Sequence, residues 1–290
     1  MEYLLHVCVL VGIYAILAMS LDIVLGYAGI PSLGHSAFAL IGAYTTSLLT
    51  LQTGLSPWVA LWGAAGISSL AGSLAAYPAV RLKGDYVALA TLGLAIIVEG
   101  IARNWTGLTR GAMGLPGIPN FQIEGQGITG PGGNLVIVTA MTLLCFGVLS
   151  LVANRPFGRV LRAIRDDEDA AQSLGKNTAR FKVEAFIISA FFTGLGGALY
   201  AHYVTFISPS TFSVMESLTI LLMVILGGMG TLRGAVLGAV VLIVLPESLR
   251  FLGLPMSVFA PLRQILYGTI LVVLMMYRPS GLIGTYRWTQ

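Results

Sequence analysis

The sequence is poor in charged residues and in cysteine. Charged residues make up only 10% of its 290 positions, whereas hydrophobic residues make up 56% and the mean hydropathy is +0.87. Because a water-soluble domain carries about 25% charged residues, this composition excludes a soluble globular protein. The long apolar runs also lack the alternation of transmembrane β-strands, which excludes a closed barrel and predicts an all-α polytopic membrane protein.

Motifs of enzymes are missing as well. The chain has no G-x-x-x-x-G-K-[ST] phosphate loop, no H-E-x-x-H and no G-x-S-x-G, and Cys8 and Cys145 each lie inside an apolar run. The two cysteines are therefore expected to be small buried hydrophobic residues rather than a disulfide or a metal pair. We expect no catalysis, no ATP hydrolysis, and no metal or cofactor bound by this chain. The net charge of +4 fits the basic bias of cytoplasmic loops better than nucleic acid binding.

Apolar runs that approach the length of a membrane span are frequent along the whole chain. With about 20 apolar residues needed for each crossing, we predict about eight or nine transmembrane helices in a single domain, residues 1–290. Several are short or interrupted by glycine, which is typical of tilted or broken helices around a polar pathway. The predicted helices cover residues 3–25, 35–51, 57–80, 86–103, 135–153, 183–204, 214–227, 235–249 and 262–277.

The distribution of basic residues predicts the orientation of these helices. If the predicted spans alternate, twelve of the sixteen basic residues lie on one side, which the positive-inside rule assigns to the cytoplasm. This places the N-terminus in the periplasm and the C-terminus in the cytoplasm, although a broken second helix would reverse the N-terminus. Two connections are long, namely a periplasmic loop at residues 104–134 and a cytoplasmic loop at residues 154–182.

The cytoplasmic loop has the pattern of an amphipathic helix that ends at Gly175. Its apolar residues recur at helical spacing, and charged residues occupy the other faces. Such a helix can lie at the lipid headgroups, but the four consecutive acids from Asp166 to Asp169 would be repelled by an anionic leaflet, which favours a protein partner. The apolar positions are Phe157, Val160, Leu161, Ile164, Ala171 and Leu174.

Within this loop, residues 169–175 have the form acidic-Ala-Ala-x-x-x-Gly. The segment resembles the cytoplasmic loop signature of ABC importer permeases, in which small residues let a short helix seat in a groove of the ATPase subunit. The residues that we expect to couple to an ATPase are Arg159, Arg162, Arg165, Asp166, Asp167, Glu168, Asp169, Ala170, Ala171 and Gly175.

A second candidate site interrupts the first long apolar stretch. Gly26, Gly29, Ser32, Gly34 and His35 place glycine and polar groups where the first two predicted helices meet. They form either a broken helix that lines the translocation pathway or a cytoplasmic or interfacial turn between two ordinary spans. His35 is then either part of that pathway or a hydrogen-bonded packing residue.

Other residues in the predicted spans have more ordinary interpretations. Acids in a membrane are costly and suggest function, but three of them lie toward helix ends, where they reach headgroups or water. Glycines are expected to allow close packing of helices. The acids are Asp22, Glu99, Glu216 and Glu247, and the glycine motifs lie at residues 194–197, 227–230 and 234–238.

Taken together, the motifs resemble the LivM-type permease subunit of branched-chain amino acid ABC importers. The similar stretches follow the order of that family over nearly the whole chain. Two departures concern the expected periplasmic mouth, where Ile96 replaces an acidic residue and Arg110 begins an altered glycine element. The similar stretches are residues 26–29, 32–38, 41–44, 81–86, 91–93, 157–159, 163–168, 208–209, 226–230 and 278–282.

The resemblance implies a permease of the bacterial inner membrane that works in an assembly. It implies a second related permease, two cytoplasmic ATPase subunits that bind ATP, and a periplasmic binding protein that delivers the amino acid. Residues 81–85 are then a second cytoplasmic contact. Two alternatives stay open, namely an ABC permease for urea or amides and a secondary transporter driven by an ion gradient.

Overall fold

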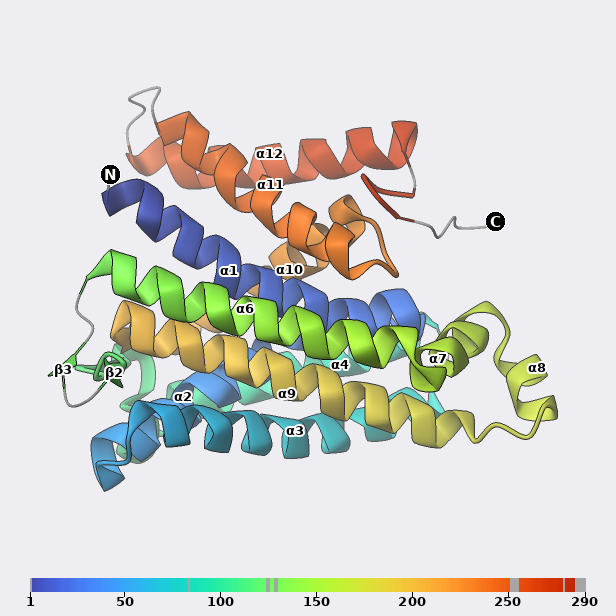
Figure 1. Ribbon diagram of the computed structural model, residues 1–290, viewed down its shortest axis with the longest axis horizontal. Helices are drawn as coiled ribbons and strands as arrows, with labels where there is room; N and C mark the ends of the chain where they lie inside the picture. Colours follow the sequence, from blue (N-terminus) through green and yellow to red (C-terminus); the bar gives the residue numbers. More distant parts are fainter. Residues whose placement is uncertain are drawn as a thin grey trace.

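The computed structural model describes residues 2–82, 84–123, 126–127, 130–250, 256–278 and 280–284. Long helices run side by side along the long axis of the molecule (Figure 1), so the protein is an all-α bundle. Six helical segments of the described chain are long and apolar enough to cross a membrane. They are Glu2–Tyr27, Pro57–Pro78, Asp85–Asn104, Gly132–Asn154, Thr178–Val204 and Pro209–Gly227.

Each predicted helix has a counterpart in the structure, although several begin earlier than predicted. α6 starts at Pro131, a residue that suits the first turn of a helix because it needs no N–H partner. α9 starts at Thr178, because the side chain of Asn177 caps it by accepting from the Arg180 amide at 3.1 Å. The long helices are α1 (Glu2–Asp22), which continues as a π-helix (Ile23–Tyr27), α2 (His35–Thr53), α3 (Pro57–Arg81), α4 (Asp85–Asn104), α6 (Pro131–Asn154), α9 (Thr178–Val204), α10 (Val214–Gly227), α11 (Leu232–Arg250) and α12 (Met256–Tyr277).

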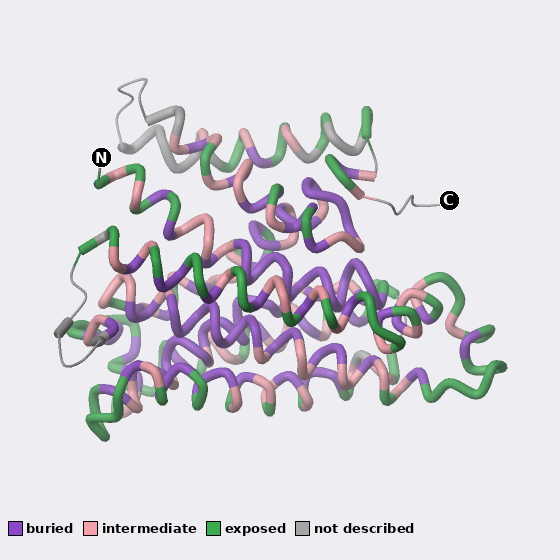
Figure 2. The backbone as a smooth tube through the Cα atoms, viewed as in Figure 1, coloured by how far each residue is buried: buried purple, intermediate pink, exposed green. Residues whose placement is uncertain are grey.

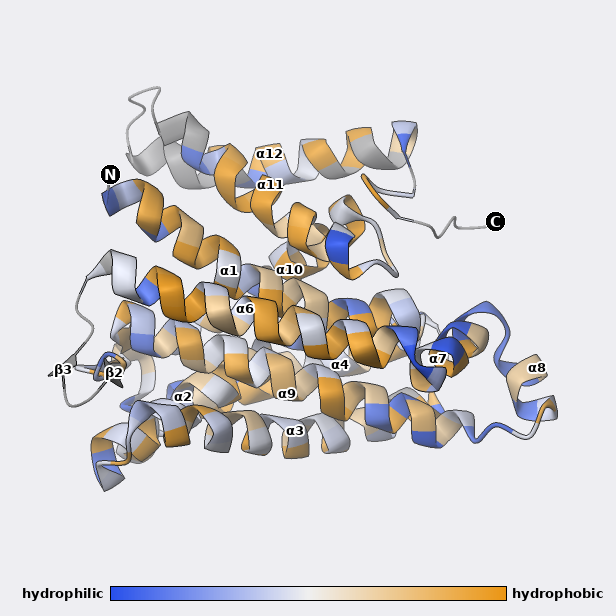
Figure 3. Ribbon diagram, in the orientation of Figure 1, coloured by the Kyte–Doolittle hydropathy of each residue, from blue (hydrophilic) through white to orange (hydrophobic). Residues whose placement is uncertain are grey.

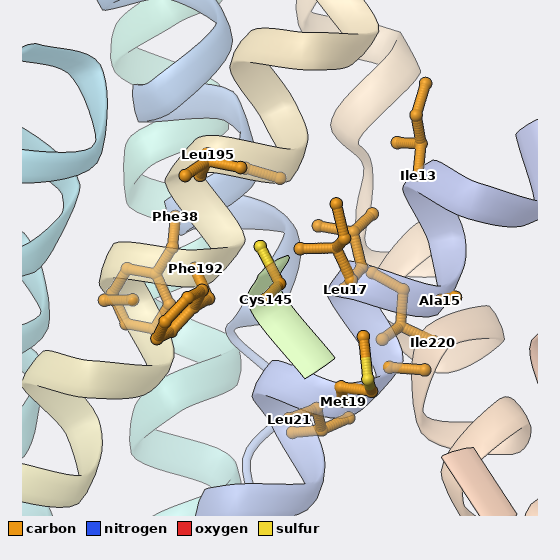
Figure 4. Close-up of a cluster of buried hydrophobic side chains, with 14 of the residues drawn as sticks. Ile13, Ala15, Leu17, Met19, Leu21, Phe38, Cys145, Phe192, Leu195 and Ile220 are labelled. Atoms are coloured by element: carbon orange, nitrogen blue, oxygen red, sulfur yellow. The ribbon is translucent and has the colours of Figure 1, made fainter. Parts of the chain in front are cut away.

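The core of the bundle forms around α1, which packs against α6, α9, α10 and α11. Because α1 is apolar on all sides, it is stable only when neighbouring helices surround it. Its inner half is buried on all faces (Figure 2). Leu17 and Met19 of α1 lie close to Ile220 of α10 in the cluster of Figure 4. Cys145 is buried as predicted, whereas Cys8 is exposed because it lies on an outer face near the start of α1.

Glycines let several helices touch backbone to backbone, as predicted. A methyl group on Gly42 of α2 would overlap the backbone of Gly194 in α9, and one on Gly197 would overlap Ala39. Gly238 of α11 is equally close to the Met223 carbonyl of α10. Small residues at these positions therefore set the distances between helices.

The two ends of the bundle differ in charge. α7 (Pro156–Asp166) and α8 (Glu168–Ser173) project from one end, which is strongly hydrophilic (Figure 3). We call this the basic end; it also carries Leu82, Gly84 and the connections at residues 28–34 and 228–231. Arg103 and Arg110 lie toward the opposite end. The described basic residues of the basic end are Arg81, Arg155, Arg159, Arg162, Arg165, Lys176, Arg180, Lys182, Arg233 and Arg278.

The opposite end is closed by short elements, most of them from the predicted periplasmic loop. Leu115 pairs with Ile207 in a small antiparallel ladder, and His202 of α9 contacts the Pro119 carbonyl through Nδ1 at 2.7 Å and the Phe121 ring. These contacts give the described part of the loop a defined structure. The elements are α5 (Thr106–Thr109), η2 (Gly111–Met113), β1 (Leu115–Pro116), β2 (Gln122–Ile123), β3 (Gln126–Gly127), β4 (Phe206–Ile207) and η3 (Pro209–Phe212).

Candidate functional site

The predicted coupling segment forms two helices rather than one. α7 ends at Asp166 and α8 begins at Glu168, because Asp167 adopts an extended backbone and its Oδ1 accepts from the Ala170 amide at 2.9 Å. Asp167 is thus an N-cap that starts a new helix. Gly175 ends the segment as predicted, with a left-handed backbone (φ 76°) that few other residues adopt.

The faces of this segment agree with the predicted pattern at all but one of its apolar positions. Leu161, Ile164 and Ala171 are buried against the bundle. Leu174 has the same apolar spacing as these residues, but it follows the last residue of α8 and is 80% exposed. The exposed residues between Arg159 and Gly175 are Arg159, Ala163, Asp166, Asp167, Asp169, Ala170, Gln172, Ser173, Leu174 and Gly175.

Arg165 connects the coupling segment to the end of α1. Its Nη1 donates to the Gly26 carbonyl at 2.7 Å, while its Nε donates to Asp166 Oδ1 at 3.0 Å. Gly29 (φ 70°) lies directly against this side chain, since a methyl group there would stand 2.5 Å from Arg165 Cγ. Arg165 therefore fits this place only because residue 29 has no side chain.

Asp22 forms the second half of the same contact. Its Oδ1 accepts from the Gly230 amide at 2.8 Å, and the residue is fully buried. The prediction that Asp22 reaches headgroups or water is therefore wrong, because the turn between α10 and α11 covers it. A methyl group on Gly26 would overlap both Asp22 Oδ1 and the Gly230 amide, so this contact also requires glycine.

Three predicted motifs thus meet at one point, which we call the glycine junction: Asp22, Gly26, Gly29, Arg165 and Gly230. It joins the π-helix of α1, the coupling helix α7 and the α10–α11 turn through backbone groups. Such contacts adjust little when the helices move, because a backbone carbonyl or amide moves only together with its own segment of the chain. A displacement of α7 must consequently shift the end of α1 or break the junction.

Two further charged residues of the segment, Arg162 and Glu168, hold it to the bundle. Lys182 Nζ of α9 forms an ion pair with Glu168 Oε1 at 2.7 Å, and only 8% of the lysine side chain is exposed. Arg162 donates to the Ala153 and Gly158 carbonyls, both at 3.3 Å. These contacts fix α7 and α8 against α6 and α9, which makes the segment one mechanical unit.

A polar cavity of about 290 Å³ lies between the coupling segment and the bundle. Leu82 and Gly84 belong to its wall, so the predicted second contact at residues 81–85 lies beside the first; Lys83 is outside the described residues. The lining residues are Ala28, Gly29, Ile30, Pro31, Leu82, Gly84, Val87, Ile164, Arg165, Asp166, Asp167, Glu168 and Lys182.

Residues 28–34 run from this cavity into the bundle without regular structure. Ile30 lines the cavity with Lys182, whereas His35 contacts Ser189, seven residues or about 10 Å further along α9. The Leu33 amide donates to Thr91 Oγ1 at 3.0 Å, and Gly34 packs on the Thr91 carbonyl. Irregular backbone at this depth is tolerated because protein surrounds it.

His35 begins α2 inside a buried polar cluster. Its Nε2 lies 2.7 Å from Thr193 Oγ1 and 3.1 Å from Ser20 Oγ. These contacts are those of a hydrogen-bonded packing residue, one of the two interpretations above. His35 Nδ1 and Ser32 Oγ are buried without a hydrogen-bond partner in the described part of the chain.

The two predicted segments lie side by side in the structure, but several residues that join them are not among the predicted site residues. Asp22, Thr91, Lys182 and Gly230 were not among the predicted site residues. Asp22 carried a signal, since a carboxylate within a span is rare. Gly230 lies in a motif whose spacing predicts helix packing, and Lys182 lies at the end of the predicted cytoplasmic loop.

The chain matches the family described as branched-chain amino acid transport system, permease component, over residues 3–275. It is 38% identical to the high-affinity branched-chain amino acid transport system permease protein LivM of Salmonella typhimurium, over 95% of this chain and 68% of that protein. It is 37% identical to LivM of Escherichia coli K12, over 97% and 70%. A related permease protein of the same system, LivH of Salmonella typhimurium, is 26% identical over 93% and 91%. No solved structure matches the chain.

Proposed function

Because the chain belongs to the family of branched-chain amino acid transport system permease components, we propose that it translocates branched-chain amino acids across the bacterial inner membrane. It is a transport permease and not an enzyme. In this proposal it is a membrane-spanning subunit of an ATP-driven importer. About eight or nine of its helices cross the membrane, including α2, α11 and α12.

The proposed assembly contains a second related permease, two ATPase subunits that bind ATP, and a periplasmic binding protein. The similarity to both LivM and LivH proteins supports two related permeases in one transporter. The basic end faces the cytoplasm, as the positive-inside rule requires for its many arginines and lysines. The N-terminus and the small strands then lie in the periplasm.

One observation carries the coupling part of the proposal: Arg165 of α7 binds the Gly26 carbonyl at the end of α1. The exposed face of α7 and α8 contacts the ATPase, and closure of the ATPase pair on ATP displaces this unit. The glycine junction passes the displacement to α1, which lies at the centre of the bundle. The helices around α1 then rearrange between inward-facing and outward-facing states.

The segment from Gly26 to His35 borders the translocation pathway in this proposal. Two observations support the assignment, namely its irregular backbone inside the bundle and the unpaired polar atoms of Ser32 and His35 among the described residues. A backbone without helical hydrogen bonds changes shape at lower cost than a helix. The segment is therefore the part of the bundle that movement of α1 would alter first.

Uptake of radiolabelled leucine into proteoliposomes tests the proposed function. The vesicles contain this chain with its permease, ATPase and binding-protein partners, and receive either internal ATP or an ion gradient alone. We expect uptake only with ATP and all partners. Uptake by this chain alone on a gradient would establish a secondary transporter, and ATP-dependent uptake of urea or amides but not leucine would change the cargo.

A further inference from the structure

A second cavity, of about 510 Å³, opens at the basic end beside α6. It lies where the last turns of α6, the helix α7, the α10–α11 turn and the end of α1 surround one space. Its wall combines apolar side chains with two guanidinium groups. The lining residues are Tyr27, Phe146, Ser150, Asn154, Arg162, Gly230, Thr231, Leu232, Arg233 and Ile283.

The wall of this cavity is positively charged. Arg162 and Arg233 are its only ionisable groups besides the Tyr27 hydroxyl, and no carboxylate of the described chain lies within ion-pair distance of either arginine. The Arg162 guanidinium stacks over the Tyr27 ring, 5.7 Å from its centroid. Ser150 and Asn154 add neutral hydrogen-bonding groups to the same wall. This is the composition of a site for a phosphate or another anion.

The surroundings of the cavity are those of a lipid-facing surface. α6 exposes Leu143, Leu144, Val148 and Leu151 along its outer side, and most of its residues are exposed or half-buried. Phe146 and Ser150 come from the last turns of this helix, and Asn154 is its final residue. Apolar groups therefore line the deeper part of the cavity and arginines the part near the helix ends, which is the level of the headgroups.

We propose that this cavity binds an anionic phospholipid of the cytoplasmic leaflet. The phosphate lies between Arg162 and Arg233, the ester oxygens of the glycerol backbone lie beside Ser150 and Asn154, and the upper acyl carbons pack on Phe146. Basic pockets between transmembrane helices on the cytoplasmic side commonly hold anionic headgroups. Since Gly230 of the glycine junction also lines the cavity, together with Tyr27 beside Gly26, the lipid lies next to the glycine junction.

Lipid titration of the purified transporter tests the proposal without any measurement of uptake. The assembled transporter is delipidated in detergent and titrated with phosphatidylglycerol or phosphatidylcholine, and native mass spectrometry counts the lipids bound to this subunit. We expect Arg233→Gln to weaken phosphatidylglycerol binding about fivefold, and Arg162→Gln with Arg233→Gln about 25-fold. Arg180→Gln is the matched control, because Arg180 is an exposed arginine of α9 at the basic end and outside the cavity. Its binding should equal that of the wild type.

Each other outcome overturns the proposal. Equal binding of the two lipids, or unchanged binding in Arg233→Gln, would exclude a site for an anionic phospholipid at this cavity. Because Arg162 also holds the α6–α7 connection, the exposed Arg233 provides the decisive variant. Full displacement of the lipid by excess inorganic phosphate would identify a site for a free anion, and crosslinking of Arg233→Cys to the second permease would identify a subunit interface.

Discussion

A single methyl group at residue 29 should uncouple transport from ATP hydrolysis. In Gly29→Ala the new Cβ stands 2.5 Å from Arg165 Cγ, 3.1 Å from Arg165 Cβ and 3.2 Å from Arg165 Cα. The side chain of Arg165 cannot avoid this overlap by rotating its outer end, because the crowded atoms are those nearest the backbone. α7 must therefore move away from the end of α1, and the bond from Arg165 to the Gly26 carbonyl breaks.

Two free-energy terms set the size of the effect. Alanine in the left-handed region costs about 1–2 kcal/mol, which lowers stability but does not act on coupling. Loss of a hydrogen bond to a charged group costs about 1.5–3 kcal/mol, and this term acts directly on the contact between α7 and α1. Since 1.4 kcal/mol corresponds to about tenfold, we expect ATP-driven uptake to fall at least about tenfold per assembled transporter.

Gly54→Ala is the matched control for this experiment. Gly54 also has a left-handed backbone (φ 68°), but nothing lies within 4 Å of its added methyl group. Both variants therefore carry the same backbone cost, and only Gly29→Ala disturbs Arg165. The assay measures leucine uptake and ATP hydrolysis in the same proteoliposomes. Continued hydrolysis with lost uptake in Gly29→Ala alone is the expected result, and equal uptake by the two variants would refute the role of the junction.

Two further predictions concern the contacts around the junction. Asp22→Ala should leave the half-buried Gly230 amide without its acceptor and destabilise the protein by about 1–3 kcal/mol, whereas Asp22→Asn keeps an oxygen at that place; equal thermal midpoints of the two variants in detergent would argue against the Asp22 contact. Lys182→Met should remove the ion pair to Glu168 and speed hydrogen exchange in α8, whereas Arg180→Met breaks a solvent-exposed pair of little energetic value. Identical exchange in these two variants would show that the buried pair does not hold α8.

The helices could be predicted from the sequence because length and hydrophobicity determine them. α10 has the predicted bounds, and α2 begins at the predicted His35. The earlier starts of α6 and α9 were missed because local signals, a proline at the first turn and an asparagine cap, extend helices beyond their apolar stretches. The break at Asp167 was missed for a similar reason, since the apolar spacing continues across it.

The site could be predicted in its segments but not in its contacts. Residues 26–35 and 159–175 were both identified, yet nothing in the spacing indicates that Arg165 meets Gly26, a residue 139 positions away in the sequence. That contact depends on how α7 packs against the end of α1 in the folded protein. The importance of Gly230 was equally hidden, because a glycine that packs helices and a glycine that offers its amide to a carboxylate look the same in a sequence.

Crosslinking to the ATPase tests the central claim most directly. In a Cys8→Ser background, Ser173→Cys places a single exposed thiol on α8, and Gln52→Cys places one at the opposite end of the bundle. With the assembled transporter and a bifunctional thiol reagent, we expect Ser173→Cys to crosslink to the ATPase subunit in a yield that ATP changes, and Gln52→Cys to give no such product. Crosslinking of the ATPase to residue 52, or none to residue 173, would contradict the account.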